Sequence, residues 1–305
     1  MVDYYGAQAC CGTYAFINAA QSYETDVDLF EAMTSVPFGL KHIEGDFKRI
    51  LTAFANCNEY LDGVAEFMGF CTETRRCDAA QDVSEVIRND AECGDRFMIG
   101  PVDMGHLTHI PQSFYYTGQD HYFTVEVQSK DCLLVIDSEG TLFYPYTYDA
   151  LDRVLSVGGI PESCGNFTIR RFSGGDQPRS QEEILCLILK RAACNMALAR
   201  KTDQGARTFY RCWDVMNHSA SIKWRLPLIH DASFLIQRKF MLRRLLPLWS
   251  ADWIRPEIDR QIGILVSVRQ KLLVQEMVDH ICFANLADIE NNISDAVIEL
   301  EAQLL

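Results

Sequence analysis

The amino-acid sequence predicts an α+β protein, with helices and an antiparallel sheet in the first part of the chain and an all-helical region after it. Short β-branched or aromatic segments bounded by turn residues occur before residue 173. A segment rich in Gly, Pro and Ser follows at Ser173–Gln181. Every later segment has helically spaced apolar residues. We therefore expect two domains, at 1–172 and 181–305.

Four segments of the first part have the character of strands. They are Arg96–Met104, His121–Val127, Cys132–Asp137 and Phe167–Phe172. Four other segments have helical spacing, namely Thr13–Gln21, Phe47–Phe54, Glu59–Phe70 and Asp82–Arg88. Alternating helices and short strands of this kind favour the α+β class.

The helical region opens with a capping box, because Ser180 precedes an apolar run and Glu183 stands three residues later. The spacing of apolar residues then predicts helices over about 181–201, 205–217, 231–247, 256–284 and 287–304. Such a region could serve as a lid, a docking surface or an oligomerisation surface.

Composition bounds the class of protein. The chain has 305 residues, 48% of them hydrophobic, and 12 scattered cysteines. The first residues lack the Lys and Arg of a signal peptide, and no apolar stretch reaches the roughly 18 residues of a membrane helix. We expect a cytoplasmic protein with reduced thiols. No metal site is expected, because there is no CxxC pair and His106 and His109 stand apart from any close cysteine pair.

The net charge of −14 is unevenly distributed. Residues 1–150 hold 24 acidic and 8 basic side chains, whereas residues 151–305 hold 18 and 20. Residues 179–244 are rich in Lys and Arg. This asymmetry fits either two partners of opposite charge or a solvated helical surface. We expect no nucleic-acid or membrane partner.

Cys11 is a candidate nucleophile. A helix N-terminus stabilises a thiolate, and Cys11 directly precedes a predicted helix. Gly12 leaves room for a tetrahedral intermediate to approach backbone amides. The alternative is that Cys11 is a small buried hydrophobe. Cys10 is a rival nucleophile.

His121 and Asp137 are candidates for a base and its orienting carboxylate. The two strands that carry them are separated by QSKD and should form an antiparallel hairpin. Pairing Val127 with Cys132 puts His121 opposite Ser138, and a slip of one position puts it opposite Asp137. Either register brings the two side chains near one another. The alternative is a hairpin-end histidine bonded to backbone and a turn aspartate.

Several stretches resemble the papain-like superfamily, and more narrowly the butirosin biosynthesis protein H family of acyltransferases. They are ACCGTYAFINAA, DVDLFEAMTSVPFGL, GPVDM, DHYFTVEV, LLVIDSEG and FYPYTYDALDRVL, within residues 5–157. The resemblance implies a papain-like cysteine protease fold with Cys11 as nucleophile, His121 as base and Asp137 as orienting acid. Papain-like proteases usually supply an oxyanion glutamine six residues before the cysteine. Tyr5 is at that position, so we assign the oxyanion donors to Gln8 and the Cys11 amide.

The resemblance also implies a reaction. An acyl group passes from a carrier-protein thioester to Cys11 and then to a small amine or diamine, as a step of antibiotic biosynthesis. No cofactor is expected, since phosphopantetheine enters as part of the carrier-bound substrate. The partner would be an acyl or peptidyl carrier protein, and a homodimer is left open. Hydrolysis by a peptidase or thioesterase, or an inactive binding module, are the alternatives.

Further residues are assigned to the two substrates. An aromatic cluster near the histidine suits an acyl chain, although it could equally be ordinary core and loop aromatics. The substrate-binding candidates are Phe114, Tyr115, Tyr116 and Asp103. The basic segment could dock an acidic carrier through Lys190, Arg191, Arg200, Lys201, Arg207 and Arg211.

Overall fold

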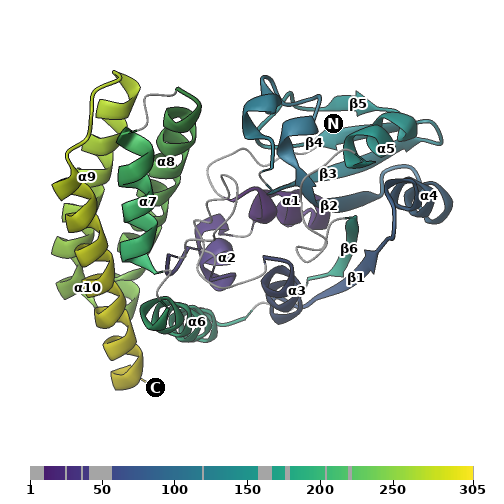
Figure 1. Cartoon of the computed structure of the whole chain (residues 1–305). Coiled ribbons are helices and arrows are strands. Elements are labelled where there is room, and N and C mark those ends of the chain that lie inside the picture. The colour runs from purple at the N-terminus through teal and green to yellow at the C-terminus, as the bar shows by residue number, and fades with distance from the viewer. Residues whose placement is uncertain are drawn as a thin grey trace. The chain divides into compact units, whose positions relative to one another are not determined.

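A computed structural model describes residues 10–24, 26–35, 37–40, 57–118, 120–156, 167–175, 179–202, 205–218 and 222–304, without the side chains of 57–59, 115 and 222–227. The chain divides into two compact units (Figure 1). The first is Met1–Phe30 with Asn56–Arg179, and the second is Glu31–Ala55 with Ser180–Leu305. The division at 179/180 falls within the Gly-, Pro- and Ser-rich segment. The expected domains differ from these units in that residues 31–55 belong to the second unit.

The first unit contains a six-stranded antiparallel sheet with the strand order β1-β6-β2-β3-β4-β5. The strands are β1 (Phe70–Arg76), β2 (Arg96–Asp103), β3 (Asp120–Ser129), β4 (Cys132–Ile136), β5 (Tyr144–Tyr146) and β6 (Thr168–Gly174). Together with the helices of both units, this sheet confirms the α+β class. The predicted helix Phe47–Phe54 lies outside the described residues.

Helices pack on both faces of this sheet (Figure 1). Successive residues of a strand point to opposite faces. Thr124 faces α1, whereas Phe123 and Val125 belong to an apolar core on the other face. That core includes residues of α4 and α5. The helices of this unit are α1 (Cys11–Ala20), α3 (Cys57–Phe67), α4 (Ala80–Asp90) and α5 (Tyr148–Ser156), and α2 (Val27–Met33) spans the boundary between the units.

Helix α1 is buried along almost its whole length. Residues 12–19 are all buried, and the ring of Phe16 stacks on that of Phe30 at 4.3 Å between centroids. Cys10, with extended backbone angles, precedes the helix, and Gln21 ends it in the left-handed conformation. The helix begins at Cys11, two residues before the predicted start. The candidate nucleophile is therefore the first helical residue.

The β3–β4 hairpin forms in a register that differs from both predicted ones. Val127 pairs with Leu133, and Ser129 pairs with Cys132 across a bulge. The predicted pairing of Val127 with Cys132 was wrong by one position, because the extra residue of the bulge was not foreseen. Continued past Ile136, this register puts Asp137 opposite Phe123. His121 lies two residues from Phe123 on the same strand face, so it remains a diagonal neighbour of Asp137.

The second unit is helical, as expected. Its long helices are α6 (Gln181–Lys201), α7 (Ala206–His218), α8 (Ile222–Leu245), α9 (Arg255–Leu273) and α10 (His280–Leu304), with 3₁₀ turns at Pro247–Trp249 and Asp252–Ile254. The capping box is confirmed, since Ser180 Oγ accepts the Glu183 amide and the Glu183 carboxylate accepts the Ser180 amide. An apolar core around Phe209, Tyr210 and Trp213 joins α7 to α8, α9 and α10.

Several boundaries were predicted wrongly. The last two helices separate at 274–279 and not near 285. Gln275, within this connection, adopts a left-handed conformation with φ 61°. Helix α8 begins at Ile222 rather than near 231. Strand β1 was missed because most of it is polar and exposed, and β5 because three residues carry too little periodicity. Within the described residues, no helix has the length and apolar character needed to cross a membrane.

Candidate active site

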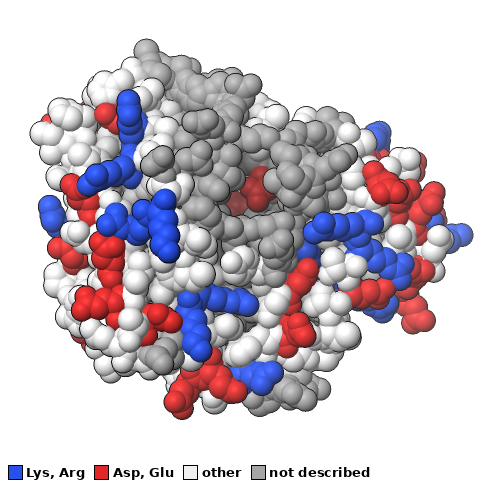
Figure 2. All heavy atoms as spheres, turned by 60° about the horizontal axis from the view of Figure 1, so that its bottom comes forward, with Lys and Arg blue, Asp and Glu red and all other residues white. Residues whose placement is uncertain are grey.

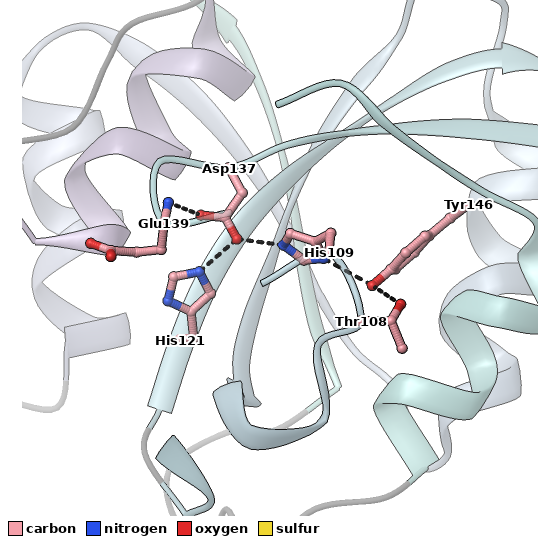
Figure 3. A network of polar contacts seen from close by, with 6 residues as sticks. All are labelled: Thr108, His109, His121, Asp137, Glu139 and Tyr146. Carbon is pink, nitrogen blue, oxygen red and sulfur yellow. Dashed lines mark hydrogen bonds and ion pairs between the residues drawn. The ribbon is translucent and has the colours of Figure 1, made fainter. Parts of the chain in front are cut away.

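Asp137 is the centre of a buried polar network at the end of β4 (Figure 3). Its Oδ2 atom lies 2.6 Å from His109 Nε2 and 2.8 Å from His121 Nε2. Its Oδ1 atom accepts the backbone amide of Glu139 at 3.0 Å. A buried carboxylate is costly unless donors surround it, and here three donors do so. Asp137 can therefore stay ionised inside the protein.

The electrostatics agree with this geometry. Burial alone would raise the pKa of Asp137, because it disfavours the charged carboxylate. The charge of His121, together with the hydrogen bonds from His109 and His121, outweighs that effect. The pKa of Asp137 consequently lies well below its ordinary value, and the carboxylate is available as an acceptor across the physiological pH range.

His121 is oriented by its bond to Asp137. A carboxylate only accepts hydrogen bonds, so His121 Nε2 carries a proton and the neutral ring has its lone pair on Nδ1. Nδ1 lies on the side of the ring away from Asp137 (Figure 3). Burial opposes the charged imidazolium, but the charge and hydrogen bond of Asp137, with the charges of Glu139 and Asp120, raise the pKa of His121 above its ordinary value. The ring is thus prepared to accept and hold a proton.

Cys11 occupies the start of α1 and is half-buried. The dipole of a helix favours negative charge at this end, and no acidic residue in the first turn opposes it. Cys10 is also half-buried, but it precedes the helix in an extended conformation. Of the two cysteines, Cys11 is the better placed for stabilisation as a thiolate.

Two tethers fix the direction of α1 along β3. Thr124 Oγ1 donates to the carbonyl oxygen of Ala15 at 2.7 Å. About one turn further along the helix, the carbonyl oxygen of Asn18 accepts from Arg96 Nη1 at 3.1 Å. Arg96 pairs with Glu126, which lies two residues after Thr124. The helix and the strand therefore run in the same direction, and Cys11 lies toward the end of β3 that begins with Asp120 and His121.

Asp120 and Cys10 give independent support for this placement. Asp120 is exposed at the first position of β3, yet the surrounding protein desolvates its carboxylate enough to raise its pKa. The charge of Cys10 is the next largest cause of the same shift. Electrostatic coupling of this kind requires that the residue before Cys11 lie near the residue before His121. The start of α1 and the start of β3 therefore lie near one another.

His109 was not predicted as a site residue. It lies in the segment between two 3₁₀ turns, Met104–His106 and Ser113–Tyr116, where no periodic pattern marks it. Its side chain is buried, and its Nδ1 atom lies 2.8 Å from Tyr146 Oη. Tyr146 in turn contacts Thr108 Oγ1 at 3.0 Å. The network therefore extends from His121 through Asp137 and His109 to β5 (Figure 3).

No protein-family model and no curated protein matches the chain. Within the described residues, no group of three or more His, Cys, Asp or Glu side chains could hold a metal ion.

The predicted substrate and oxyanion residues fall into three groups. Gln8 and the side chain of Tyr115 lie outside the described part of the chain. Asp103 is buried and accepts the backbone amides of Gly105 and Gly118, each at 2.9 Å, so it shapes the loop before β3. Phe114 is 63% exposed, whereas Tyr116 packs against the core of the sheet. Of the two described aromatic side chains in this group, Phe114 is the more exposed.

The predicted docking residues are only partly available. Arg191 donates to the Met33 carbonyl oxygen at 2.6 Å, Arg200 pairs with Asp295 at 2.8 Å, and Arg207 lies 3.6 Å from Asp288. The remaining three are exposed, and no ion pair joins them to another described residue; they are Lys190, Lys201 and Arg211. On the face shown in Figure 2, Lys and Arg side chains alternate with Asp and Glu rather than forming one basic field.

Proposed function

We propose that this protein is a cysteine-dependent acyltransferase with a papain-like fold, in which Cys11 is the nucleophile, His121 the general base and Asp137 the orienting carboxylate. The observation that carries the proposal is the 2.8 Å bond between His121 and a buried, ionised Asp137. That bond leaves Nδ1 of His121 as the basic nitrogen, at the end of β3 toward which the Cys11 end of α1 is directed.

The papain-like assignment is supported by three features together. A cysteine begins a buried helix, that helix packs on an antiparallel sheet, and consecutive antiparallel strands supply a histidine and an aspartate. The chain order of cysteine, histidine and aspartate is that of the resemblance described above. The role of each residue follows from its chemistry, since a thiolate attacks, an imidazole transfers protons and a carboxylate holds the imidazole.

The first half-reaction would acylate Cys11. Nδ1 of His121 accepts the thiol proton of Cys11, and the resulting thiolate attacks the carbonyl carbon of a carrier-bound thioester, so that the bond to the phosphopantetheine sulfur breaks. The leaving thiolate then takes that proton from the His121 imidazolium. The backbone amide of Cys11 is our candidate donor for the oxyanion of the intermediate. Thiol attack on a thioester exchanges similar leaving groups, so this step is close to thermoneutral.

The second half-reaction would form an amide. A neutral amine attacks the acyl-Cys11 carbonyl carbon, its proton passes to Nδ1 of His121, and the Cys11 thiolate leaves. Asp120 and Glu139 both act electrostatically on His121, so two carboxylates lie near the site of attack. Their charge favours a cationic amine or diamine, which must lose a proton before it attacks. We therefore favour an amine over water as the acceptor.

A carrier protein would supply the acyl group. Acidic carriers bind basic surfaces, and the part of the predicted surface that remains available is Lys190, Lys201 and Arg211. Lys190 and Lys201 are 11 residues apart on α6, which returns them to the same helix face. We propose that this face of α6 contributes to carrier binding.

The proposal is tested by separating the two half-reactions. A small thioester donor alone should leave Cys11 acylated, as a mass increase of the intact protein located to Cys11 by peptide mapping. A primary diamine should then discharge the acyl-enzyme and give an amide product. Discharge at the same rate with and without the diamine would show that water is the acceptor, and the peptidase or thioesterase alternative would replace the acyltransferase. Failure of Cys11 to react with thioesters or alkylating reagents would favour the inactive binding module.

A further inference from the structure

His109 has every feature of a buried polar residue whose contacts are complete. Its side chain is fully buried between the rings of Phe123, Tyr144 and Tyr146. Nε2 contacts Asp137 and Nδ1 contacts the Tyr146 hydroxyl. Both ring nitrogens are therefore occupied by protein atoms, and His109 has no group left to touch a substrate.

The protonation pattern of the network is also determined. Asp137 can only accept, so His109 Nε2 carries a proton. In the neutral ring Nδ1 then accepts from the Tyr146 hydroxyl group. Thr108 Oγ1 is placed to donate to Tyr146 Oη at 3.0 Å. One consistent set of donors and acceptors thus runs from Thr108 to the oxygen of Asp137 that His121 also contacts (Figure 3).

The backbone around His109 is fitted to this position. A Cβ atom at Gly140 would lie 2.7 Å from both Cδ2 and the carbonyl oxygen of His109. The amide of Thr141 donates to the same carbonyl oxygen at 2.8 Å. The loop after Asp137 therefore holds His109 from one side while Tyr146 holds it from the other, which fixes its ring relative to Asp137.

We propose that His109 is a positioning residue of the catalytic centre, which holds Oδ2 of Asp137 in the orientation that serves His121 and takes up part of that oxygen's negative charge. This inference rests on the proposed role of His121 as the base. It assigns His109 a function through Asp137 and not through the substrate, because the ring is buried and both nitrogens are occupied.

The proposal has a measurable consequence for proton affinity. The charged groups that act on His121 come from two parts of the fold. They are Asp137 and Glu139 after β4, and Asp120 beside His121 in β3. His109 acts through Asp137, which it contacts at 2.6 Å, and Cys10, which precedes α1, is coupled electrostatically to Asp120. The hydrogen bond from His109 stabilises the Asp137 carboxylate and reduces its hold on the proton of His121. Removing that hydrogen bond should raise the pKa of His121 further.

The experiment is an NMR titration of the histidine ¹³Cε1–¹H signals in the full chain, with the His121 signal assigned from a His121→Asn variant. His109→Gln places an amide donor near the former Nε2 position. His109→Phe fills the same aromatic surroundings without a donor. We expect His121 in His109→Gln to titrate within about 0.3 pH units of the unmodified protein, and in His109→Phe about one unit higher.

A His109→Phe protein that keeps its near-ultraviolet circular dichroism and melting temperature, yet shows an unshifted His121 titration, would overturn the proposal. If that variant does not fold, Tyr146→Phe decides the question, since it removes only the hydroxyl group that fixes Nδ1. A smaller upward shift supports the proposal and no shift overturns it. Tyr144→Phe, on the same strand with its ring 5.6 Å from Tyr146, is the matched control and should leave the titration unchanged.

Neither outcome depends on a substrate. If Cys11 fails to form an acyl-enzyme while His109→Phe still shifts the titration, the acyltransferase proposal fails and the positioning role of His109 stands. If Cys11 is acylated and the titration does not move, the acyltransferase proposal stands and His109 only fills space.

Discussion

Thr124 donates a 2.7 Å hydrogen bond to the backbone carbonyl oxygen of Ala15. This contact joins the helix that begins at Cys11 to the strand that carries His121, four residues after the cysteine and three residues after the histidine. Nucleophile and base come from segments more than 100 residues apart in the chain. Their relative position therefore depends on tethers of this kind, because chemistry between them requires approach to about 3–3.5 Å.

Thr124→Val should loosen this tether without changing the volume of the side chain. We expect the free energy of unfolding to fall by about 1 kcal/mol, the usual net contribution of one hydrogen bond. The rate of Cys11 alkylation at neutral pH should fall as well. Thr72→Val is the matched control, since Thr72 Oγ1 is buried and has no hydrogen-bond partner among the described residues. If the two variants have equal free energies of unfolding and equal rates of Cys11 alkylation, the tether is not needed.

Cys11→Ala should abolish acyl transfer, whereas Cys10→Ala should keep most of it. Only Cys11 is a residue of the helix whose N-terminus stabilises a thiolate. His121→Ala should be as damaging as Cys11→Ala, because residues that act as a unit are not additive. Asp137→Asn should cost less than either. Turnover of a defined thioester and amine measures all four variants, and an active Cys11→Ala protein would end the proposal.

The pairing of His121 with Asp137 could be predicted although its register could not. Side chains alternate along a strand, and diagonal neighbours on one face remain within reach. An error of one position at Val127 therefore left His121 and Asp137 close enough to bond. The bulge that set the true register depends on the local geometry of Gln128 and Ser129, which no periodic pattern reveals.

His109 could not be found in the same way. It belongs to a loop in which apolar residues follow neither the helical nor the strand spacing, and its partners Tyr146 and Gly140 are more than 30 residues away.

The basic segment shows a related limit of prediction from sequence. A count of charges cannot tell that Lys239 forms a buried pair with Glu290 at 2.7 Å, or that Arg191 donates to a carbonyl oxygen. The sequence gives the number of charged side chains, but which of them are exposed to solvent depends on how the helices pack.

Glu139→Gln should shift the pH dependence of the amine step. The charge of Glu139 is one of the causes that raise the pKa of His121, so its loss lowers that pKa. The amine step needs neutral His121, and its rate should rise as pH increases through this pKa. The rising limb should therefore move to lower pH, by about half a unit at low salt and less at high salt.

The measurement is the rate of acyl-enzyme discharge by a fixed concentration of diamine between pH 5 and pH 10, a range that spans the ordinary pKa of histidine at about 6.5. Glu85→Gln, an exposed substitution on α4, is the charge-matched control and should leave the limb in place. A limb that moves to higher pH in Glu139→Gln, or equally in both variants, would contradict the electrostatic role of Glu139.

Gly140→Ala should disturb the site through His109, which contacts Asp137. The added Cβ atom would lie 2.7 Å from two atoms of His109, so either the loop or the imidazole must move. We expect a loss of about 1–3 kcal/mol in the free energy of unfolding, as in other overpacked cores, with an altered His121 titration. Gly263→Ala in α9 is the control, since nothing lies near its Cβ position and alanine favours a helix. Equal stability of the two variants would show that the loop yields without cost.

Lys190→Glu combined with Lys201→Glu should weaken carrier binding without affecting chemistry. Both side chains are exposed on one face of α6, and neither belongs to the site around Asp137. We expect the KM for a carrier-bound donor to rise several-fold, with little change for a small thioester, because only the carrier presents acidic surface. Added salt should raise the KM of the unmodified protein for the carrier in the same way.

Arg200→Glu with Arg207→Glu is the matched comparison, since those two arginines pair with Asp295 and Asp288 within their own unit. Their reversal should lower the melting temperature and leave the KM for the carrier nearly unchanged. The ratio of the two KM values, carrier-bound donor over small thioester, separates docking from catalysis because a defect in the site raises both. If Lys190→Glu with Lys201→Glu changes the two KM values equally, α6 does not bind the carrier, and the acyl donor reaches Cys11 by another surface.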